Sequence, residues 1–253
     1  MLRRRRRGVR IVEQTPAYLT SAPRVTVTLV VRPDHEQEAL ESLASAAASL
    51  YDAFELLVLD VSGERPAPAV RGFLDDHPSL PARLLRQPED RGLAHSRNTL
   101  TKHARGEHVL FLDPGGRIYP STLERLVKTL EADPDAAFSY PMVAAYDGGD
   151  RPVELLSSLP WEPERLRQGN GIDGIALIRR SRLLELGGYS TDPRLAGWED
   201  FYLWCRCADA GAHGVHVPQV LGWRRHLSSP ETPAKWELMR ELFPTLLPTP
   251  SAA

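Results

Sequence analysis

Short runs of apolar residues recur along the first half of the chain, and stretches with helical spacing of apolar positions lie between them. The runs are nearly continuous in apolar character, as expected for strands buried on both faces of a parallel sheet. They cover residues 25–31, 54–60, 82–86 and 108–112. The helices predicted between and after them cover residues 34–49, 70–76, 92–104 and 120–131. This alternation predicts an α/β fold, with a Rossmann-like, doubly wound mixed sheet and helices on both faces.

The second half of the chain has a less regular pattern. Residues 146–171 mix Gly, Pro and charged residues, which is typical of a long connection that could act as a lid. Strands are predicted before and after this connection, and two helices end at glycines. The strands cover residues 136–145, 172–179 and 215–223, and the helices cover residues 181–186 and 199–210.

Composition and charge narrow the class of protein. The 253 residues are 42% hydrophobic and 25% charged with a formal net charge of −2, which suits one globular domain and gives no general attraction to nucleic acid. No specific nucleic acid partner is therefore expected. Cys205 and Cys207 are two residues apart on a predicted helix, so their side chains point to different faces and neither a disulfide nor a zinc site is expected.

The two ends of the chain are expected to lie outside the core. Residues 1–23 contain the basic run Arg3 to Arg7 and are predicted to form a disordered arm. Such an arm could make peripheral contact with an anionic membrane, although most runs of this kind are solvated. No segment approaches the ~20 apolar residues of a membrane span, so a cytoplasmic protein is expected. The Pro-rich residues 230–253 are expected to form a C-terminal tail.

Acidic residues occupy the positions where ligands of such a sheet bind. Asp60 and Asp113 follow two of the predicted strands, and ligands of doubly wound sheets bind beyond the carboxyl ends of the strands. Glu199 and Asp200 begin a predicted helix. Each residue also has an ordinary interpretation, because aspartate is common in strand-end turns and acidic residues commonly stabilise the first turn of a helix.

Five separate segments occur in an order that resembles family 2 glycosyltransferases of the GT-A fold, over residues 24–229. The resemblance implies that residues 24–145 of this chain form the nucleotide-binding half and that residues 172–229 form the acceptor half. The segments are Glu55-Leu56-Leu57-Val58-Leu59-Asp60, Arg91-Gly92-Leu93-Ala94-His95-Ser96-Arg97-Asn98, Phe111-Leu112-Asp113, Leu186-Gly187-Gly188-Tyr189 with Trp198-Glu199-Asp200, and Gly222-Trp223-Arg224-Arg225-His226.

The resemblance implies an inverting enzyme that moves a sugar from a nucleotide diphosphate donor, such as a UDP-, GDP- or dTDP-sugar, to a hydroxyl acceptor. Asp200 would be the base that takes the acceptor proton, and Glu199 would help to orient it. The residues implied in donor binding are Pro33, Asp60, Arg97, Asp113 and Arg117.

The chain departs from the family pattern at the metal-binding motif. Asp-X-Asp is replaced by Asp113-Pro114-Gly115, and Val61 stands where the family usually has a second Asp. A Mn2+ or Mg2+ ion would be left with Asp113 and His226 as its protein ligands, which is a thin set for a hard cation.

Two outcomes of this loss remain open at the level of the sequence. Arg117, Arg224 or Arg225, with the backbone N–H groups of Gly115 and Gly116, could neutralise the diphosphate. Alternatively, the chain is a catalytically silent relative that binds a nucleotide sugar or a partner protein.

Overall fold

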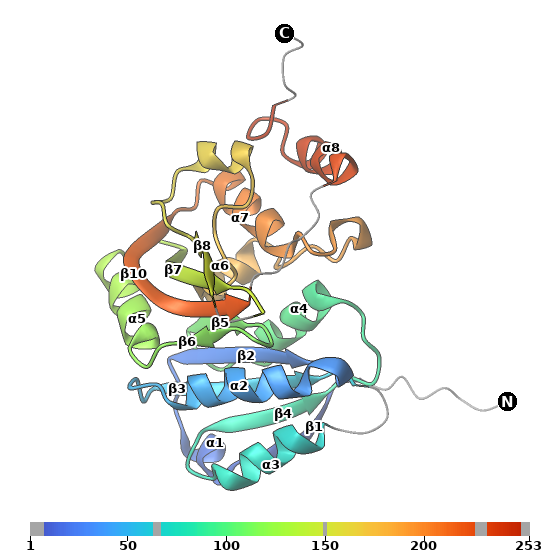
Figure 1. The fold of residues 1–253 in the computed structure, drawn as a ribbon, viewed down its shortest axis with the longest axis vertical. Helices are drawn as coiled ribbons and strands as arrows, with labels where there is room; N and C mark the ends of the chain where they lie inside the picture. The colour runs from blue at the N-terminus through green and yellow to red at the C-terminus, as the bar shows by residue number, and fades with distance from the viewer. Residues whose placement is uncertain (1–7, 63–66, 149–150, 226–231, 249–253) are drawn as a thin grey trace, which may run out of the picture.

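The computed structural model describes residues 8–62, 67–148, 151–225 and 232–248. Within these ranges the strands form one sheet in the order β1-β4-β3-β2-β5-β9-β7-β10-β6, and β8 pairs with β7 outside this path (Figure 1). The strands are β1 Arg10–Gln14, β2 Val25–Val31, β3 Phe54–Asp60, β4 Ala82–Arg86, β5 His108–Leu112, β6 Arg117–Ile118, β7 Phe138–Tyr146, β8 Pro152–Leu156, β9 Leu177–Arg179 and β10 Gly214–Arg225.

The sheet is mixed, as the sequence predicts. The pairs β2–β3, β2–β5, β3–β4 and β7–β10 are parallel, whereas β1, β6, β8 and β9 pair antiparallel with their neighbours. The carboxyl ends of β2, β3 and β5 therefore lie at the same edge of the sheet.

Helices cover both faces of the sheet. The α-helices are α1 Pro16–Thr20, α2 Glu36–Ala47, α3 Pro68–Asp76, α4 Leu93–His103, α5 Thr122–Ala132, α6 Arg180–Glu185, α7 Glu199–Asp209 and α8 Pro233–Leu242. The short 3-10 helices are η1 Pro33–His35, η2 Pro163–Gln168 and η3 Pro193–Leu195.

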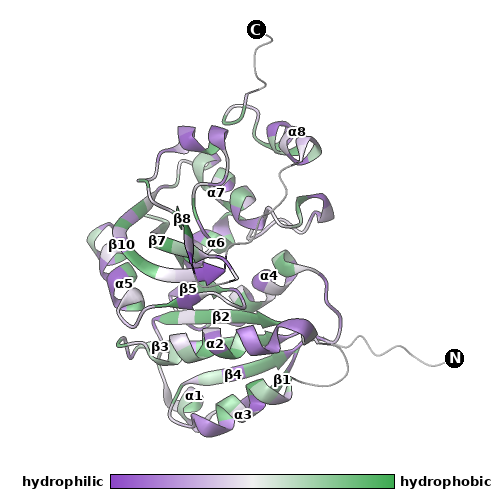
Figure 2. Cartoon of the chain, viewed as in Figure 1, coloured by the Kyte–Doolittle hydropathy of each residue, from purple (hydrophilic) through white to green (hydrophobic). Residues whose placement is uncertain are grey.

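The alternation of side chains along the buried strands explains why both faces are covered. All seven residues of β3 are buried. Leu56 and Val58 pack in the cluster that contains residues of α2, α3 and α5, whereas Leu57 and Leu59 pack on the other side with Leu100 of α4. Because successive side chains of a strand point to opposite faces, a continuous apolar run requires a helix on each side. The central strands accordingly stand out as hydrophobic in Figure 2.

The second half of the chain extends this sheet with β7, β8, β9 and β10 and adds helices to it. In Figure 1 its segments, coloured yellow to red, lie above the blue and green half, with β10 as a long curved strand. Its core contains Phe138, Trp204 and Leu183, and Met239 of α8 joins the same cluster. Cys205 and Cys207 of α7 are both buried in this core.

Three predictions about local structure are wrong. The expected disordered arm contains β1 and α1, because β1 pairs with β4 and the buried Tyr18 of α1 anchors this segment. The connection 146–171 contains β8 and η2, and the strand predicted from residue 172 begins only at Leu177. Residues 172–176 turn instead, since the carboxylate of Asp173 accepts a hydrogen bond from the N–H of Ile175.

The expected C-terminal tail is also wrong for residues 232–248, because α8 forms there and Leu238, Met239, Phe243 and Leu247 are buried in the core of the second half. Other expectations about the chain ends concern residues outside the described ranges. The basic run Arg3 to Arg7 is one of these, so its contact with a membrane stays a prediction. In the described ranges, none of the helices combines the length and the apolar character needed to cross a bilayer.

Candidate functional site

One buried arginine joins the two carboxylates that the sequence places far apart. Arg97 of α4 is 1% exposed, and its Nη1 donates to Oδ1 of Asp200 at 2.6 Å. Its Nη2 donates to both oxygens of Asp113, at 3.1 Å and 2.9 Å. The carboxyl end of β5 and the first turn of α7 therefore converge on the side of α4 that carries Arg97.

Two aromatic rings complete the surroundings of this guanidinium. Its carbon lies 5.4 Å from the ring centre of Phe111 and 5.0 Å from that of Tyr189. A buried cation is tolerated when it is paired and hydrogen-bonded, and removal of one partner leaves an uncompensated charge. Arg97 therefore fixes the relative positions of Asp113 and Asp200.

The two carboxyls differ in their proton affinity. Burial raises the pKa of Asp200, and the negative charges of Asp113 and Asp173 add to this effect against the opposing attraction of Arg97. Burial also acts to raise the pKa of Asp113, but the ion pair with Arg97, supported by Arg224 and Arg32, outweighs it and lowers that pKa. Asp200 is thus the stronger base of the two, and its side chain is 21% exposed.

A second ion pair lies beside the first. Arg224, near the end of β10, donates from Nη1 to Oδ2 of Asp173 at 2.6 Å. The Asp173 side chain is 3% exposed, and its backbone N–H donates to Oγ of Ser157 at 2.8 Å. The pair ties the end of the last strand to the turn that follows the long connection.

An open pocket of about 330 Å3 adjoins these groups. Asp113, Asp173 and Arg224 line it, whereas Arg97 and Asp200 are not among its lining residues. The other charged or ionisable residues of the lining are Arg32, His35, Glu38 and Arg225. The pocket adjoins the carboxyl ends of β2 and β5, where ligands of doubly wound sheets bind.

The structure places Asp60 apart from this pocket. Its side chain is buried at the end of β3 and accepts hydrogen bonds from the N–H groups of Ser62 and Ala67, each at 2.8 Å. It also bonds the hydroxyl of Ser62. The ordinary interpretation as a strand-end turn residue therefore describes its contacts. A contact with a nucleotide stays a prediction.

Arg117 also points elsewhere. Its Nη2 donates to Glu41 at 2.5 Å, and its guanidinium carbon lies 4.6 Å from the ring centre of Trp223. Arg117 is not among the residues that line the pocket. Its predicted contact with the donor therefore stays untested, and other arginines occupy the position expected of it.

The remaining predicted site residues are Pro33, Glu199 and His226. Pro33 starts η1 between Arg32 and His35, both of which line the pocket. Glu199 is buried in the first turn of α7, and its orienting role toward Asp200 stays a prediction. His226 lies outside the described residues.

The prediction that backbone N–H groups of Gly115 and Gly116 face a diphosphate is wrong. The N–H of Gly115 donates to the carbonyl of Glu38 at 3.2 Å and to Oγ of Ser42 at 3.1 Å. The N–H of Gly116 donates to the carbonyl of Asp113 at 2.8 Å. Both donors are used to hold the turn itself, so they do not point at a ligand.

Asn98 explains why two of the sequence motifs occur together. Its side-chain amide donates to the carbonyl of Tyr189 at 2.8 Å and its oxygen accepts from the N–H of Tyr189 at 2.9 Å. Gly188 adopts φ +77 beside this amide, a conformation that favours glycine. The Arg97-Asn98 pair thus links α4 both to the carboxylates and to the Gly-Gly turn.

The described residues at this site are a poor set of ligands for a divalent cation. Mn2+ and Mg2+ take several oxygen ligands, whereas both oxygens of Asp113 already bind Arg97. Position 115 is Gly. In the part of the chain that the structure describes, no group of three His, Cys, Asp or Glu side chains is arranged to hold an ion.

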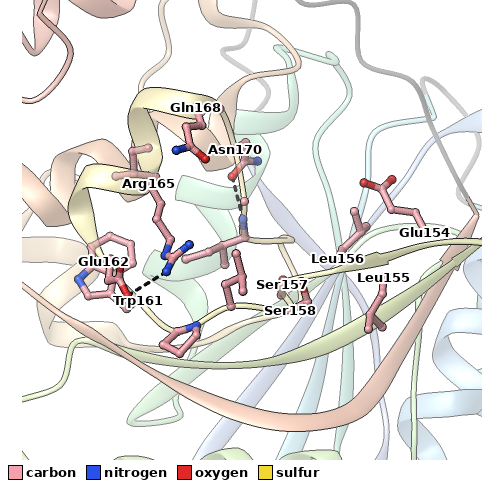
Figure 3. Close-up of a pocket in the computed structure, with 16 residues that line it drawn as sticks. Glu154, Leu155, Leu156, Ser157, Ser158, Trp161, Glu162, Arg165, Gln168 and Asn170 are labelled. Atoms are coloured by element: carbon pink, nitrogen blue, oxygen red, sulfur yellow. Dashed lines mark hydrogen bonds and ion pairs between the residues drawn. The ribbon is translucent and has the colours of Figure 1, made fainter.

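A second pocket of about 350 Å3 lies within the long connection, in the segment from Glu154 to Ile172 (Figure 3). Trp161, Arg165 and Gln168 line it. Its lining ends at Ile172, and the next residue, Asp173, lines the first pocket. Ser157, also in the lining, has φ 54, and its Oγ holds the N–H of Asp173.

Sequence reasoning missed Asp173 and Gly174 as site residues. Asp173 holds Arg224, and the backbone of Gly174 lies against the carboxylate of Asp200. Both residues follow a long connection and belong to no predicted motif. The one available signal was an Asp-Gly pair between two apolar residues, which is also an ordinary turn sequence.

Two solved chains have the same fold. S. aureus TarS 1–349 aligns with a TM-score of 0.67 at 18% identity, over 87% of this chain and 64% of TarS 1–349. The mannosyltransferase PcManGT from Pyrobaculum calidifontis, solved with GDP-Man and Mn2+, aligns with a TM-score of 0.60 at 26% identity, over 92% of this chain and 64% of its own. The fold is that of the GT-A glycosyltransferases, and this chain spans less than two thirds of both solved chains.

Sequence comparison defines the family. The model of glycosyl transferase family 2 matches residues 30–183, more than half of the chain. EpsE of Bacillus subtilis, provisionally named a glycosyltransferase, is 26% identical over 205 residues, which are 80% of this chain and 73% of EpsE. This chain belongs to glycosyl transferase family 2, a family of enzymes.

Proposed function

We propose that this chain transfers a sugar from a nucleotide diphosphate donor to a hydroxyl acceptor with inversion at the anomeric carbon. The observation that carries the proposal is the Arg97 bridge, which brings Asp200 close to Asp113, a residue of the pocket lining, although the two are 87 residues apart in the sequence. The names of the related proteins support the donor class, since PcManGT was solved with GDP-Man and TarS with UDP-GlcNAc.

In the proposed reaction, the acceptor oxygen attacks the anomeric carbon from the side opposite the diphosphate. The new bond joins that oxygen to the anomeric carbon, and the bond between the carbon and the diphosphate oxygen breaks. Asp200 takes the acceptor proton, and the nucleoside diphosphate leaves with the electron pair. A single displacement of this kind inverts the configuration of the carbon.

The surroundings of Asp200 support its role as the base. A general base works best when its pKa lies near the working pH, and burial raises the pKa of Asp200. The bond to Arg97 uses Oδ1. The other oxygen, Oδ2, faces Gly174, and the carboxylate is held by the ion pair at the start of α7.

The experiment is an assay of nucleoside diphosphate release from a panel of UDP-, GDP- and dTDP-sugars, with saccharides or water as the acceptor. Asp200→Asn should reduce the rate at least 100-fold, which is typical for loss of a general base. Calorimetry should show donor binding within about threefold of the parent, since Asn can still accept from Arg97. Asp209→Asn, at the far end of α7, is the matched control and should retain the parent rate.

A fully active Asp200→Asn variant would refute the assignment of the base. Inversion is checked separately by NMR of the anomeric proton of the product, and retention of configuration would contradict the single displacement. If the parent binds a nucleotide sugar but releases no nucleoside diphosphate from any donor, the catalytically silent alternative is correct instead.

A further inference from the structure

The pocket contains a set of arginines at the place where a metal would be expected. Arg32, Arg224 and Arg225 line the pocket beside Asp113 and the Gly115 turn. Both carboxylate oxygens of Asp113 accept hydrogen bonds from Arg97, and residue 115 is a glycine, which has no side-chain oxygen. The charge that would face a diphosphate is therefore carried by guanidinium groups.

Arg224 is held in a position to bind an anion. Its Nη1 is fixed by the buried Asp173 at 2.6 Å, and its Nε donates to the carbonyl of Arg225 at 3.3 Å. Neither bond uses Nη2, and the side chain is 28% exposed. A guanidinium fixed through Nη1 and Nε loses little freedom when Nη2 binds phosphate.

Arg225 adds a second positive charge next to it. It is exposed, lines the same pocket, and has no ion pair with any residue of the described ranges. Arg32 forms an ion pair with Asp90 at 2.8 Å, so less of its positive charge is available to attract a phosphate. Arginine binds phosphate oxygens with short, charge-assisted hydrogen bonds, often in pairs.

We propose that Arg224 and Arg225 form the diphosphate subsite of this enzyme and replace the divalent cation, so that donor binding is independent of metal. This inference rests on the proposed function. The two guanidinium charges match the charge that collects on the departing diphosphate, and Asp173 positions one of them.

The first test is calorimetry with UDP, GDP and dTDP, in EDTA and in Mn2+. The nucleotide that binds most tightly should bind with the same affinity in both conditions, within about twofold. A tenfold or greater increase in affinity with Mn2+ would overturn the inference while leaving the proposed glycosyl transfer intact. Failure of all three nucleotides to bind in both conditions would instead contradict the proposed function.

The second test identifies the residues. In EDTA, Arg225→Gln should weaken binding of the nucleoside diphosphate about tenfold, the effect of one lost charge-assisted hydrogen bond. Binding of the same nucleoside without phosphate should be unchanged. Arg182→Gln is the control, because Arg182 is an exposed arginine of α6 paired with Glu185. Equal diphosphate affinities of Arg225→Gln, Arg182→Gln and the parent would overturn the assignment.

A third variant restores the missing carboxylate. A side chain at position 115 would meet Glu38 only at an ordinary contact distance of 3.9 Å, and the φ of +82 strains aspartate less than most other residues. Gly115→Asp should therefore make nucleotide binding at least tenfold tighter in Mn2+ than in EDTA. An equal response of the variant and the parent to Mn2+ would overturn the claim that Gly115 removes the metal requirement.

Discussion

At the scale of single residues, the backbone of Gly174 leaves no space beside the carboxylate of Asp200. A Cβ atom at Gly174 would lie 2.9 Å from Oδ2 and 3.3 Å from Cγ of Asp200. Contacts this short force one of the two groups to move. Gly174 is therefore a positioning residue for the proposed base.

Gly174→Ala should displace the Asp200 carboxylate and reduce the turnover number about 10- to 100-fold, since small misplacements of reacting groups have effects of this size. Steady-state kinetics with the donor identified by the panel measures the effect, and the affinity for the nucleoside diphosphate should change little. The matched control is Gly171→Ala, because a Cβ at Gly171 meets nothing within 4 Å. Equal turnover of the two variants would contradict the proposed role of Gly174.

Because the pKa of Asp200 is raised, the dependence of the reaction rate on pH can be predicted. The base must be ionised to take a proton, so the rate should fall as the pH falls through the pKa of Asp200. Burial raises that pKa, and Asp113 and Asp173 add to it, so the acid limb of the pH–rate profile should lie above the ordinary aspartate value of about 3.9.

Asp173→Asn should move this acid limb to lower pH. The substitution removes one negative charge that raises the pKa, and it releases Arg224, whose positive charge favours the ionised carboxylate. The profile of the turnover number against pH measures the shift. A limb that stays in place or moves to higher pH would show that another group controls it.

At the scale of elements, a single side chain joins α4 to the turn that follows α6. Asn98 makes two hydrogen bonds with the backbone of Tyr189, at 2.8 Å and 2.9 Å. The Tyr189 ring in turn packs on Phe111 of β5 at 5.2 Å and lies over Arg97. The site therefore depends on this link between the two halves of the chain.

Asn98→Ala should lower the free energy of unfolding by about 2 kcal/mol, because it leaves both backbone groups of Tyr189 without their partners. Urea denaturation followed by circular dichroism measures this change. Lys102→Ala on the same helix is the control, since Lys102 is exposed and should change the stability by less than about 0.5 kcal/mol. A loss for Asn98→Ala no larger than that of the control would mean that the link is not structural.

At the scale of the whole molecule, the sequence predicted the sheet better than the site. The fully buried strands β2 and β3 were recognisable because most of their positions are apolar. The half-exposed strand β1 and the exposed strand β8 were missed, because edge strands lack that apolar signal.

Only those residues of the site that belong to sequence motifs could be predicted. Arg97, Asp113 and Asp200 were found from separate motifs, but the bonds that join them span up to 103 residues and depend on how distant segments of the chain pack together. The partners of Asp60, Arg117 and the Gly115 N–H group depend on neighbouring loops, which local patterns do not describe.

The most direct test of the account is a crystal structure of the chain with the nucleotide sugar that the panel selects. We predict that the diphosphate lies in the pocket between the Asp113 turn and the end of β10, with the Asp200 carboxylate facing the anomeric carbon on the side opposite the diphosphate. A nucleotide sugar bound elsewhere, or an Asp200 carboxylate that faces away from the anomeric carbon, would contradict the account.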